Sequence, residues 1–393
     1  VLIDKFLPRR DWLNQLKWRG SWSVVGNPIP NTLFARQSYD FSNGTISTRP
    51  PLFDDPQPET TTSFETGLDV WMFENKFNFD LTYYNSTLRN QFLYVTTANG
   101  ESKPVNTGKI RNYGLEFQAS YRWNINKDWR WQTGFNIAWN DNRILETYKT
   151  ESGAPYEVQM GPNAFKIKYV EGGRYGDIYV NSFARDENGH IKINDAGNYE
   201  NAVPVMASGK YETKVGNMTS PVTLGWNNTF TWKNFTLYFL IDGRIGGKVM
   251  SLTEADLDLY GLSERSAQDR LNGERVMQNG KEYILKPLPD GSGNKVSVEN
   301  YYTTIGALPM EDHVYNATSL RMRDISLSYD MPNLFGKNQG MTAQFSVKNA
   351  FFIYKDSPVD PDISVSAANG YSGIDCYSLP TTRSFALTLK FNF

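Results

Sequence analysis

Few residues of this sequence have the types and spacing that covalent chemistry requires. Only two histidines occur, His190 and His313. His190 follows an Asn-Gly pair that predicts a hairpin turn, and the nearby acidic residues lack the spacing of a calcium-binding loop, although a metal site is the alternative. His313 follows Glu311 and Asp312 and could form the His/Asp couple of a protease, but a hydrogen-bonded loop histidine is the simpler interpretation. We therefore predict no catalytic residue and no metal ligand.

Other patterns associated with bound groups are also incomplete. The pairs Gly172-Gly173 and Gly246-Gly247 are not followed by the Lys-Ser/Thr of a phosphate-binding loop, so they predict turns. The single cysteine, Cys376, excludes an internal disulfide and a cysteine-based zinc site. The formal net charge is −2 and the basic residues are spread along the chain, which excludes the basic stripe of a nucleic-acid binder. No cofactor and no nucleic-acid partner are expected.

A loop near the C-terminal end carries side chains suited to binding rather than to catalysis. Tyr371, Asp375 and Tyr377 could contact an oligosaccharide or a peptide through ring stacking and hydrogen bonds. The alternative is that they only hold the loop together. Either role depends on the elements that carry the loop.

Those elements are predicted by strict alternation of apolar and polar residues over eight or more positions, which is typical of strands with one buried face. The last segment is the clearest example, with Phe385, Leu387, Leu389 and Phe391 on one face. A change of phase between Met322 and Ile325 predicts a β-bulge. The pattern predicts ten strands, at residues 16–25, 63–72, 77–84, 112–123, 129–140, 222–232, 235–244, 320–331, 341–349 and 382–393.

The connections between these strands alternate in length. The short ones are residues 73–76, 124–128, 233–234 and 332–340, and the long ones are residues 27–59, 93–110, 143–221, 247–319 and 350–381. Short periplasmic turns and long extracellular loops are the rule in outer-membrane barrels. The sequence contains no run of about 18 apolar residues, so it predicts no membrane-spanning helix. We therefore predict an all-β fold, an antiparallel transmembrane β-barrel in the outer membrane.

Aromatic residues make up 14% of a chain whose mean hydropathy is −0.52. Such a composition fits strands of which every second residue meets lipid, although a soluble β-sandwich could share it. Trp123, Trp129, Trp131 and Trp232 lie beside the short turns, where an aromatic girdle at the lipid interface is expected. The alternative places them in the core of a soluble sheet.

Several strings of the sequence together resemble the barrel of SusC-like TonB-dependent transporters of Bacteroidota. They are residues 16–27, 59–69, 80–85, 112–116, 317–329 and 359–362. The resemblance runs in order over nearly the whole chain. Two departures are Asp362, where the family often has Glu, and Asn349-Ala350-Phe351, where Asn-Leu-Phe is more usual.

The resemblance implies a 22-stranded barrel with an N-terminal plug, a TonB-interacting segment and a SusD-like lipoprotein that covers the extracellular mouth. Residues 1–393 then correspond to the last ten strands, without the plug or the TonB-interacting segment, and Val1 begins a fragment. The implied function is TonB-dependent uptake of oligosaccharides or oligopeptides, without enzymatic activity. The alternative is a self-contained ten-stranded outer-membrane enzyme such as a protease.

Three further expectations concern individual segments. Phe393, Phe391 and Leu389 resemble the C-terminal signal that is read during barrel assembly. The leucines at 257, 259, 262 and 271 predict a short loop helix between Thr253 and Leu271. This helix either packs on other loops or docks on the SusD-like lipoprotein. The two terminal strands are expected not to pair with each other, because each must pair with sequence outside this chain.

Overall fold

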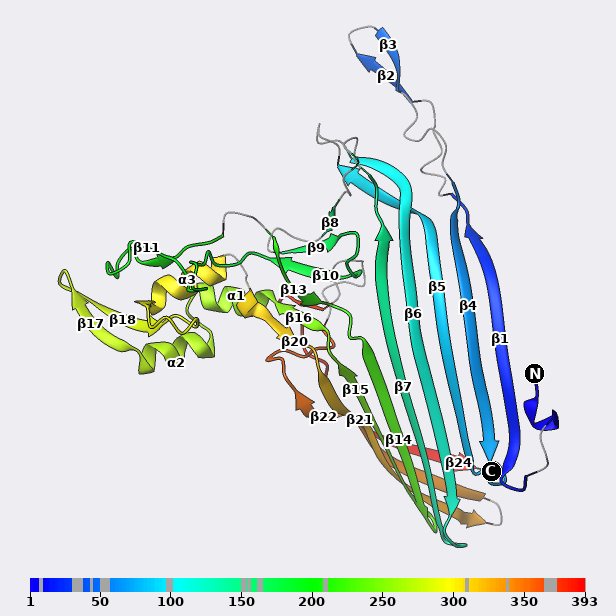
Figure 1. The fold of residues 1–393 in the computed structure, drawn as a ribbon. Coiled ribbons are helices and arrows are strands. Elements are labelled where there is room, and N and C mark those ends of the chain that lie inside the picture. The colour runs from blue at the N-terminus through cyan, green and yellow to red at the C-terminus, as the bar shows by residue number, and fades with distance from the viewer. Residues whose placement is uncertain are drawn as a thin grey trace.

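One curved antiparallel sheet of ten strands dominates the molecule, and a lobe of shorter elements projects from one of its ends (Figure 1). The computed structural model describes residues 1–6, 10–29, 38–42, 45–49, 57–96, 102–149, 153, 157–160, 165–207, 211–307, 311–336, 339–363 and 373–392. The ten strands of the large sheet follow one another in chain order and confirm the predicted number. In that order they are β1 (Leu13–Asn27), β4 (Glu59–Met72), β5 (Phe77–Thr96), β6 (Ser102–Asn124), β7 (Trp129–Glu146), β14 (Val222–Trp232), β15 (Phe235–Ile245), β21 (Ser319–Gly336), β22 (Gln339–Lys355) and β24 (Ser384–Asn392).

The register of the sheet separates two faces. One row across the strands is apolar and consists of Trp18, Leu68, Leu81, Phe117, Ile137 and Leu224. The next row is polar or small and consists of Lys17, Asp69, Asp80, Gln118, Asn136 and Gly225. Successive side chains of a strand point to opposite faces, so the sheet has an apolar face and a polar face. This arrangement confirms the alternation that the sequence predicts.

The predicted bulge lies at Arg323. Met322 pairs with Ile241 and Asp324 pairs with Leu240, so Arg323 is the extra residue between two consecutive residues of β15. A bulge of this kind changes which side chains point to each face. It adds a second arginine to the polar side of β21, two residues after Arg321.

Three of the predicted short turns are confirmed at one end of the sheet, which we call the turn end. They are residues 73–76, 125–128 and 233–234. The short connection predicted at 332–340 is shorter in the structure, because β21 continues to Gly336 across a register shift and β22 begins at Gln339. The loop predicted at 93–110 is also shorter, since Leu93 to Thr96 pair with Val105 to Ser102 beyond a second irregularity.

The opposite end of the sheet, which we call the rim, carries the long connections. They form the hairpin β2 (Ser38–Ser42) and β3 (Thr45–Arg49), β8 (Val158–Met160), β9 (Lys166–Tyr169), β10 (Asp177–Val180), β11 (Ile193–Asn194), β12 (Val203–Pro204), β13 (Thr213–Asn217), β16 (Lys248–Ser251), β17 (Glu274–Gln278), β18 (Lys281–Pro287), β19 (Lys295–Ser297), β20 (Val314–Asn316) and β23 (Ile374–Asp375). Among the described residues this region also contains three α-helices, α1 (Leu252–Leu259), α2 (Glu264–Asn272) and α3 (Val298–Ala307), and a short 3-10 helix (Glu311–His313). We call the elements from β8 to β20, except the long strands, the lobe.

The single helix predicted at Thr253 to Leu271 is two helices. The chain breaks at Gly261, which has a φ of +65°, and Ser263 then caps α2 by accepting a hydrogen bond from the amide of Ser266. Helix α3 was not predicted from the sequence. It is the centre of a buried cluster that includes Tyr301, Tyr302 and Ile305.

The buried core of the described residues lies mainly in the lobe and where the lobe meets the rim, while much of the apolar face of the sheet is exposed. Trp22 is 70% exposed, Leu387 is 71% exposed and Phe385 is 65% exposed. These strands bury little against their own chain, as expected of strands that meet lipid on one side. Among the described residues, none of the helices has the length and apolar character needed to cross a membrane.

Both edges of the large sheet are open over most of their length among the described residues, because only Val1 and Leu2 bridge the outer edge of β1, at Trp18 and Lys17. β1 pairs only with β4 along its length, β24 pairs only with β22, and the described residues contain no ladder between β1 and β24. The expectation that the terminal strands do not meet is confirmed. The alternative of a self-contained ten-stranded barrel requires that ladder, so the arrangement contradicts it.

Candidate functional site

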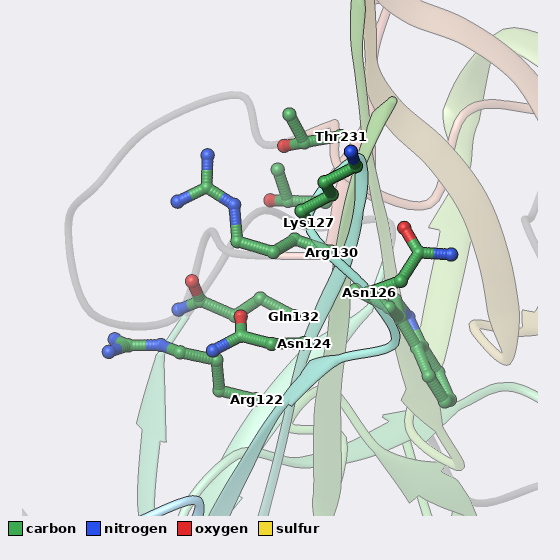
Figure 2. Close-up of a pocket in the computed structure, with 9 residues that line it drawn as sticks. Arg122, Asn124, Asn126, Lys127, Arg130, Gln132 and Thr231 are labelled. Carbon is green, nitrogen blue, oxygen red and sulfur yellow. The ribbon is translucent and has the colours of Figure 1, made fainter. Parts of the chain in front are cut away.

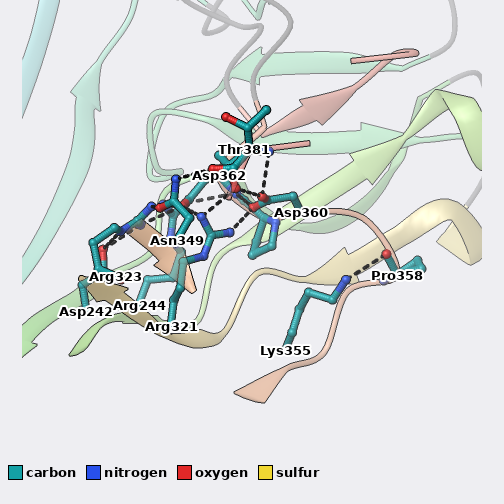
Figure 3. A network of polar contacts seen from close by, with 12 residues as sticks. Asp242, Arg244, Arg321, Arg323, Asn349, Lys355, Pro358, Asp360, Asp362 and Thr381 are labelled. Carbon is teal, nitrogen blue, oxygen red and sulfur yellow. Dashed lines mark hydrogen bonds and ion pairs between the residues drawn. The ribbon is translucent and has the colours of Figure 1, made fainter. Parts of the chain in front are cut away.

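Six charged side chains meet on the polar face at the rim (Figure 3). We call them the rim clamp: Asp242, Arg244, Arg321, Arg323, Asp360 and Asp362. Arg321 lies 2.6 Å from the carboxylate of Asp360 and 3.1 Å from that of Asp362. Arg323 bridges Asp242 at 2.6 Å and Asp362 at 2.8 Å, and Arg244 also donates to Asp362. The clamp holds three cations and three carboxylates.

Strand register brings these residues together. Asp242 pairs directly with Arg321 across β15 and β21, and the bulge places Arg323 within reach of the same carboxylate. The two remaining carboxylates come from the loop after β22, which turns back because the amide of Asp362 donates to Asp360. The clamp therefore ties the last loop to the wall of the sheet.

The centre of the rim clamp is buried. The side chain of Arg321 is 3% exposed and that of Asp360 is 5% exposed. Burial would raise the pKa of the Asp360 carboxyl, but hydrogen bonds from Thr381 and the charge of Arg321 outweigh it and hold the pKa below its ordinary value. Buried charges of this kind are tolerated only when they are paired.

A cavity of about 460 Å³ lies beside the rim clamp. Its lining combines aromatic rings, cations and carboxylates, including Phe351, Phe352, Lys355, Arg383, Asp375 and Tyr377. The structure thus brings two of the three predicted binding residues to one cavity, where Arg321 also stacks on Phe352 at 3.9 Å. Tyr371, the third, lies outside the described residues.

Asp375 and Tyr377 are held by the start of α1. The buried Asp375 carboxylate accepts a hydrogen bond from Ser251 at 2.7 Å. The exposed Tyr377 hydroxyl donates to Asp256 at 2.6 Å, and this hydrogen bond raises the pKa of Tyr377 to about 12. Both side chains therefore hold the loop together, and Tyr377 still presents its ring to solvent.

His313 takes a structural position inside the lobe. Its Nε2 lies 2.9 Å from Asp258, and both side chains are fully buried. Asp258 also accepts hydrogen bonds from Arg265 and, at 2.6 Å, from Ser263. In a hydrolytic triad the histidine stands between the hydroxyl and the acid, whereas here the acid is central and Ser263 caps α2. The interpretation of His313 as a satisfied loop histidine is confirmed.

His190 occupies the predicted turn. The amides of Asn188 and His190 both donate to the Asp186 side chain, and Gly189 has a φ of +83°. The described residues contain no group of three or more His, Cys, Asp or Glu side chains that could hold a metal ion.

The predicted girdle residues lie close to the turn end. Trp129 stacks on Trp232 with ring centroids 5.6 Å apart, and Trp123 pairs with Trp131 across β6 and β7. Trp123, Trp129 and Trp232 are more than 40% exposed, whereas Trp131 is partly buried and donates to Asn228 at 3.0 Å.

Of the residues that resemble an assembly signal, Leu389 and Phe391 lie exposed on β24. The ring centroid of Phe391 is 6.0 Å from that of Phe335 on β21. Phe393 lies outside the described residues.

A second hollow, of about 810 Å³, lies at the turn end (Figure 2). Three cations line it, Arg122, Lys127 and Arg130, and we call them the turn-end cluster. The other lining side chains are uncharged: Asn124, Asn126, Trp131, Gln132, Thr229 and Thr231. Our sequence reasoning did not find this cluster, although Arg122 and Arg130 occupy polar-face positions on either side of one short turn.

Comparison with known sequences gives a consistent result. The family model described as TonB dependent receptor-like, beta-barrel matches residues 5–350. TonB-dependent receptor P3 of Formosa agariphila is 23% identical over 99% of this chain and 40% of its own length. TonB-dependent receptor SusC of Bacteroides thetaiotaomicron is 25% identical over 99% of this chain and 39% of its own length. The chain therefore spans about two fifths of these relatives.

Solved structures show the same fold. The structure titled as the RagAB peptide importer in the open-open state superimposes with a TM-score of 0.69 at 17% identity, over 100% of this chain and 42% of that one. A second structure, titled as the RagAB peptide transporter, gives a TM-score of 0.68 at 16% identity over the same shares. At these identities the likeness establishes the architecture of the sheet and the lobe.

Proposed function

The chain belongs to the family of TonB dependent receptor-like β-barrels, and from that membership we propose that it forms barrel wall and extracellular loops of an outer-membrane nutrient importer. The family match over residues 5–350 carries this proposal. The importer takes up oligosaccharides or oligopeptides in a TonB-dependent manner and performs no covalent chemistry on them.

We propose that residues 1–393 are the C-terminal part of the barrel domain of a larger transporter, with the plug and the TonB-interacting segment in sequence outside this chain. Two observations support this. Among the described residues β24 pairs along one edge only, and the outer edge of β1 is bridged only by Val1 and Leu2, whereas open edges in hydrocarbon cost several kcal/mol for each unsatisfied group. The chain also spans only 40% of a relative such as receptor P3.

The rim cavity is the proposed place of substrate contact. Its exposed Tyr377 ring and its mixture of charged groups suit a sugar or peptide held by stacking and hydrogen bonds. Asp375 sets the position of the loop that carries Tyr377, and we propose Tyr371 as a third contact residue. The polar face of the sheet then lines the route below the cavity.

The lobe is the proposed docking site for a SusD-like surface lipoprotein. Leu262 and Leu271 are 71% and 75% exposed on the segment of α1 and α2, and Tyr260 is 73% exposed between the two helices. Large apolar side chains exposed on one projecting element are typical of a surface that binds another protein.

The two ends of the sheet differ in their proposed position relative to the membrane. We propose that the turn end faces the periplasm, that the tryptophans near it form the girdle in the lipid interface, and that Leu389, Phe391 and Phe393 form the assembly signal. Deleting Phe393 is expected to lower the outer-membrane level of the transporter. Unchanged insertion, measured by surface labelling, would contradict the assembly role.

Uptake in cells tests the importer itself. The gene of the full-length transporter is deleted in its native host, and the oligosaccharides and oligopeptides that disappear from the medium are compared with the parent strain by mass spectrometry. We expect the deletion to abolish uptake of one class, and a strain without functional TonB to show the same loss. Unchanged uptake of every carbohydrate and peptide would refute the proposal.

Purification from membranes tests the partner. The full-length transporter is isolated by an affinity tag in mild detergent, and we expect a lipoprotein to co-purify in a constant ratio. Leu262→Asp with Leu271→Asp should lower that ratio, whereas Met277→Asp, on the neighbouring hairpin, serves as the matched control. An unchanged ratio in the double variant would contradict the docking surface.

A further inference from the structure

The turn-end cluster combines positive charge with an absence of partners. Arg122, Lys127 and Arg130 are exposed and line one hollow, and no carboxylate is part of its lining. Within the described part of the chain, none of the three side chains makes an ion pair or a hydrogen bond that the structure records. Figure 2 shows Arg122 and Arg130 extending to the same side as Gln132.

Other arginines on the polar face have partners. Arg19, halfway along β1, binds Asp80 at 2.5 Å, and Arg323 binds Asp242 at 2.6 Å at the rim. Arg321, also at the rim, binds Asp360 at 2.6 Å. The two arginines of the turn-end cluster therefore differ from these arginines of the same face, which are paired with carboxylates.

The chemistry of the cluster points to carboxylates. Guanidinium groups bind carboxylates through two parallel hydrogen bonds, and three cations in one hollow attract an anion with several acidic groups. The uncharged lining offers amide and hydroxyl groups, which suit a polypeptide backbone. A volume of about 810 Å³ accepts several side chains and is much larger than a single inorganic anion needs.

We propose that the turn-end cluster is the docking site for an acidic segment of the transporter's own polypeptide outside residues 1–393. Charge complementarity supports this occupant, since the cluster lacks the carboxylates that the rim clamp contains. Length supports it as well, because the curated relatives extend over more than twice the matched region. The segment carries two or more Asp or Glu residues and contacts the polar face near the turn of residues 125–128. This contact holds the part of the polypeptide that contains the segment against the wall of the sheet.

Carbodiimide cross-linking of the full-length transporter tests this contact directly. The reagent joins a lysine amine to a carboxylate in contact with it, with loss of water. Lys127 already supplies an amine, and Arg122→Lys and Arg130→Lys add two more without changing the charge. Mass spectrometry of the digested protein is expected to show amides from these positions to acidic residues outside residues 1–393.

Two turn-end lysines provide controls in the same samples. Lys76 lies 2.8 Å from Glu74 and reports that the coupling works. Lys233 lies 5.6 Å from the ring centroid of Trp232 rather than in the hollow, so it should not couple to the acidic segment. Links from positions 122, 127 and 130 only to acids within residues 1–393, or no links while Lys76 couples, would overturn the proposal.

Charge reversal separates an ionic contact from mere proximity. Arg122→Glu combined with Arg130→Glu should lower the yield of the Lys127 link about tenfold, because charge-assisted hydrogen bonds are lost. Arg122→Gln with Arg130→Gln should give an intermediate yield. An unchanged yield in the Glu variant would contradict an ionic contact.

A free anion is the competing occupant, and inorganic phosphate is the probe for it. Calorimetric titration of phosphate into the full-length transporter should show no binding at this site, because the acidic segment already fills it. Phosphate binding that Arg130→Gln abolishes, together with missing cross-links, would overturn the proposal in favour of a small-anion site. The proposal does not depend on what is transported, so intact uptake is compatible with either result.

Discussion

The rim clamp and the turn-end cluster lie on the same face of the same sheet and each contains three cations. At the rim, three carboxylates accompany the arginines, and the central pair is almost fully buried. At the turn end no carboxylate lines the hollow and the cations are exposed. The cations of the rim clamp are neutralised by carboxylates of this chain, whereas the lining of the turn-end hollow contains no carboxylate.

This difference indicates that the two charged regions have different roles. The clamp joins strands β15 and β21 to the loop after β22, so it fixes the shape of the rim cavity from within. The turn-end cluster contributes nothing comparable to the fold of the described residues. Breaking a buried ion pair strongly lowers the free energy of unfolding, whereas removing an exposed charge changes it little. The two regions should therefore respond very differently to the same substitution.

Removing the central arginine of the clamp should have the largest effect. Arg321→Leu leaves the buried carboxylate of Asp360 without its cation, and breaking a buried pair costs about 3–5 kcal/mol. Urea denaturation of the full-length transporter should show this loss, while Arg130→Leu, at the turn end, should change stability by less than about 1 kcal/mol. Equal losses in both variants would remove the distinction between the two regions.

A double variant keeps this test informative if Arg321→Leu fails to assemble. Arg321→Leu combined with Asp360→Leu removes both charges, and replacing a buried pair by apolar residues is often close to neutral. The double variant should therefore recover most of the stability that the single variant loses. No recovery would mean that the clamp acts through its other members rather than through this pair.

The next effect separates the two faces at mid-sheet. Leu115→Arg places a cation on the apolar face, which costs about 2–4 kcal/mol near the midplane of a bilayer, and Phe135→Arg should behave in the same way. Gln118→Arg, three residues along β6 on the polar face, should be tolerated. Outer-membrane levels of the three variants, measured by surface labelling, provide the readout. Equal levels of all three would contradict the assignment of faces.

The sequence predicts the large sheet well because its signal is local. Alternation along each strand depends only on which face a residue occupies, so ten strands, two faces and the bulge at Arg323 can be read without knowing any contact. The errors lie where the alternation weakens. The extension of β21 past Pro332 depends on a register shift, and the break at Gly261 between α1 and α2 depends on backbone conformation.

The candidate site is less predictable because its contacts are distant in sequence. Arg321 and Asp360 are separated by 39 residues, and Ser251 and Asp375 by 124. No periodic pattern indicates which loop returns to which strand. The interpretation of Asp375 and Tyr377 as binding residues rested on residue type, and both line the rim cavity for a reason the sequence does not contain, namely their hydrogen bonds to the start of α1.

Acid should loosen the clamp by a smaller amount than the loss of Arg321. The pKa of Asp360 is lower in the folded protein than its ordinary value of 3.8, so its contribution to stability is fully present above that pH and is lost as the pH falls through the folded pKa. The protection of backbone amides against hydrogen exchange, relative to the intrinsic rate at each pH, should fall below about pH 4 in the described part of the last loop. Asp360→Asn should be less sensitive to this change, and an unchanged acid response would contradict the assignment to Asp360.

The smallest effect should come from the turn end, and salt should reveal its nature. Arg122→Gln with Arg130→Gln removes two exposed cations, and exposed ion pairs contribute up to about 1 kcal/mol each. If the cluster holds an acidic segment, the double variant should be less stable than the parent protein in dilute buffer. Raising the salt from about 0.1 M to about 1 M shortens the screening length from about 10 Å to about 3 Å, so this difference in stability should disappear.

The loss caused by Arg321→Leu should persist under the same conditions, because water and ions do not reach a side chain that is 3% exposed. Urea midpoints of both variants at the two salt concentrations decide the matter. A turn-end difference that survives high salt would mean that these arginines are buried and paired in the complete transporter, as those of the rim clamp already are here.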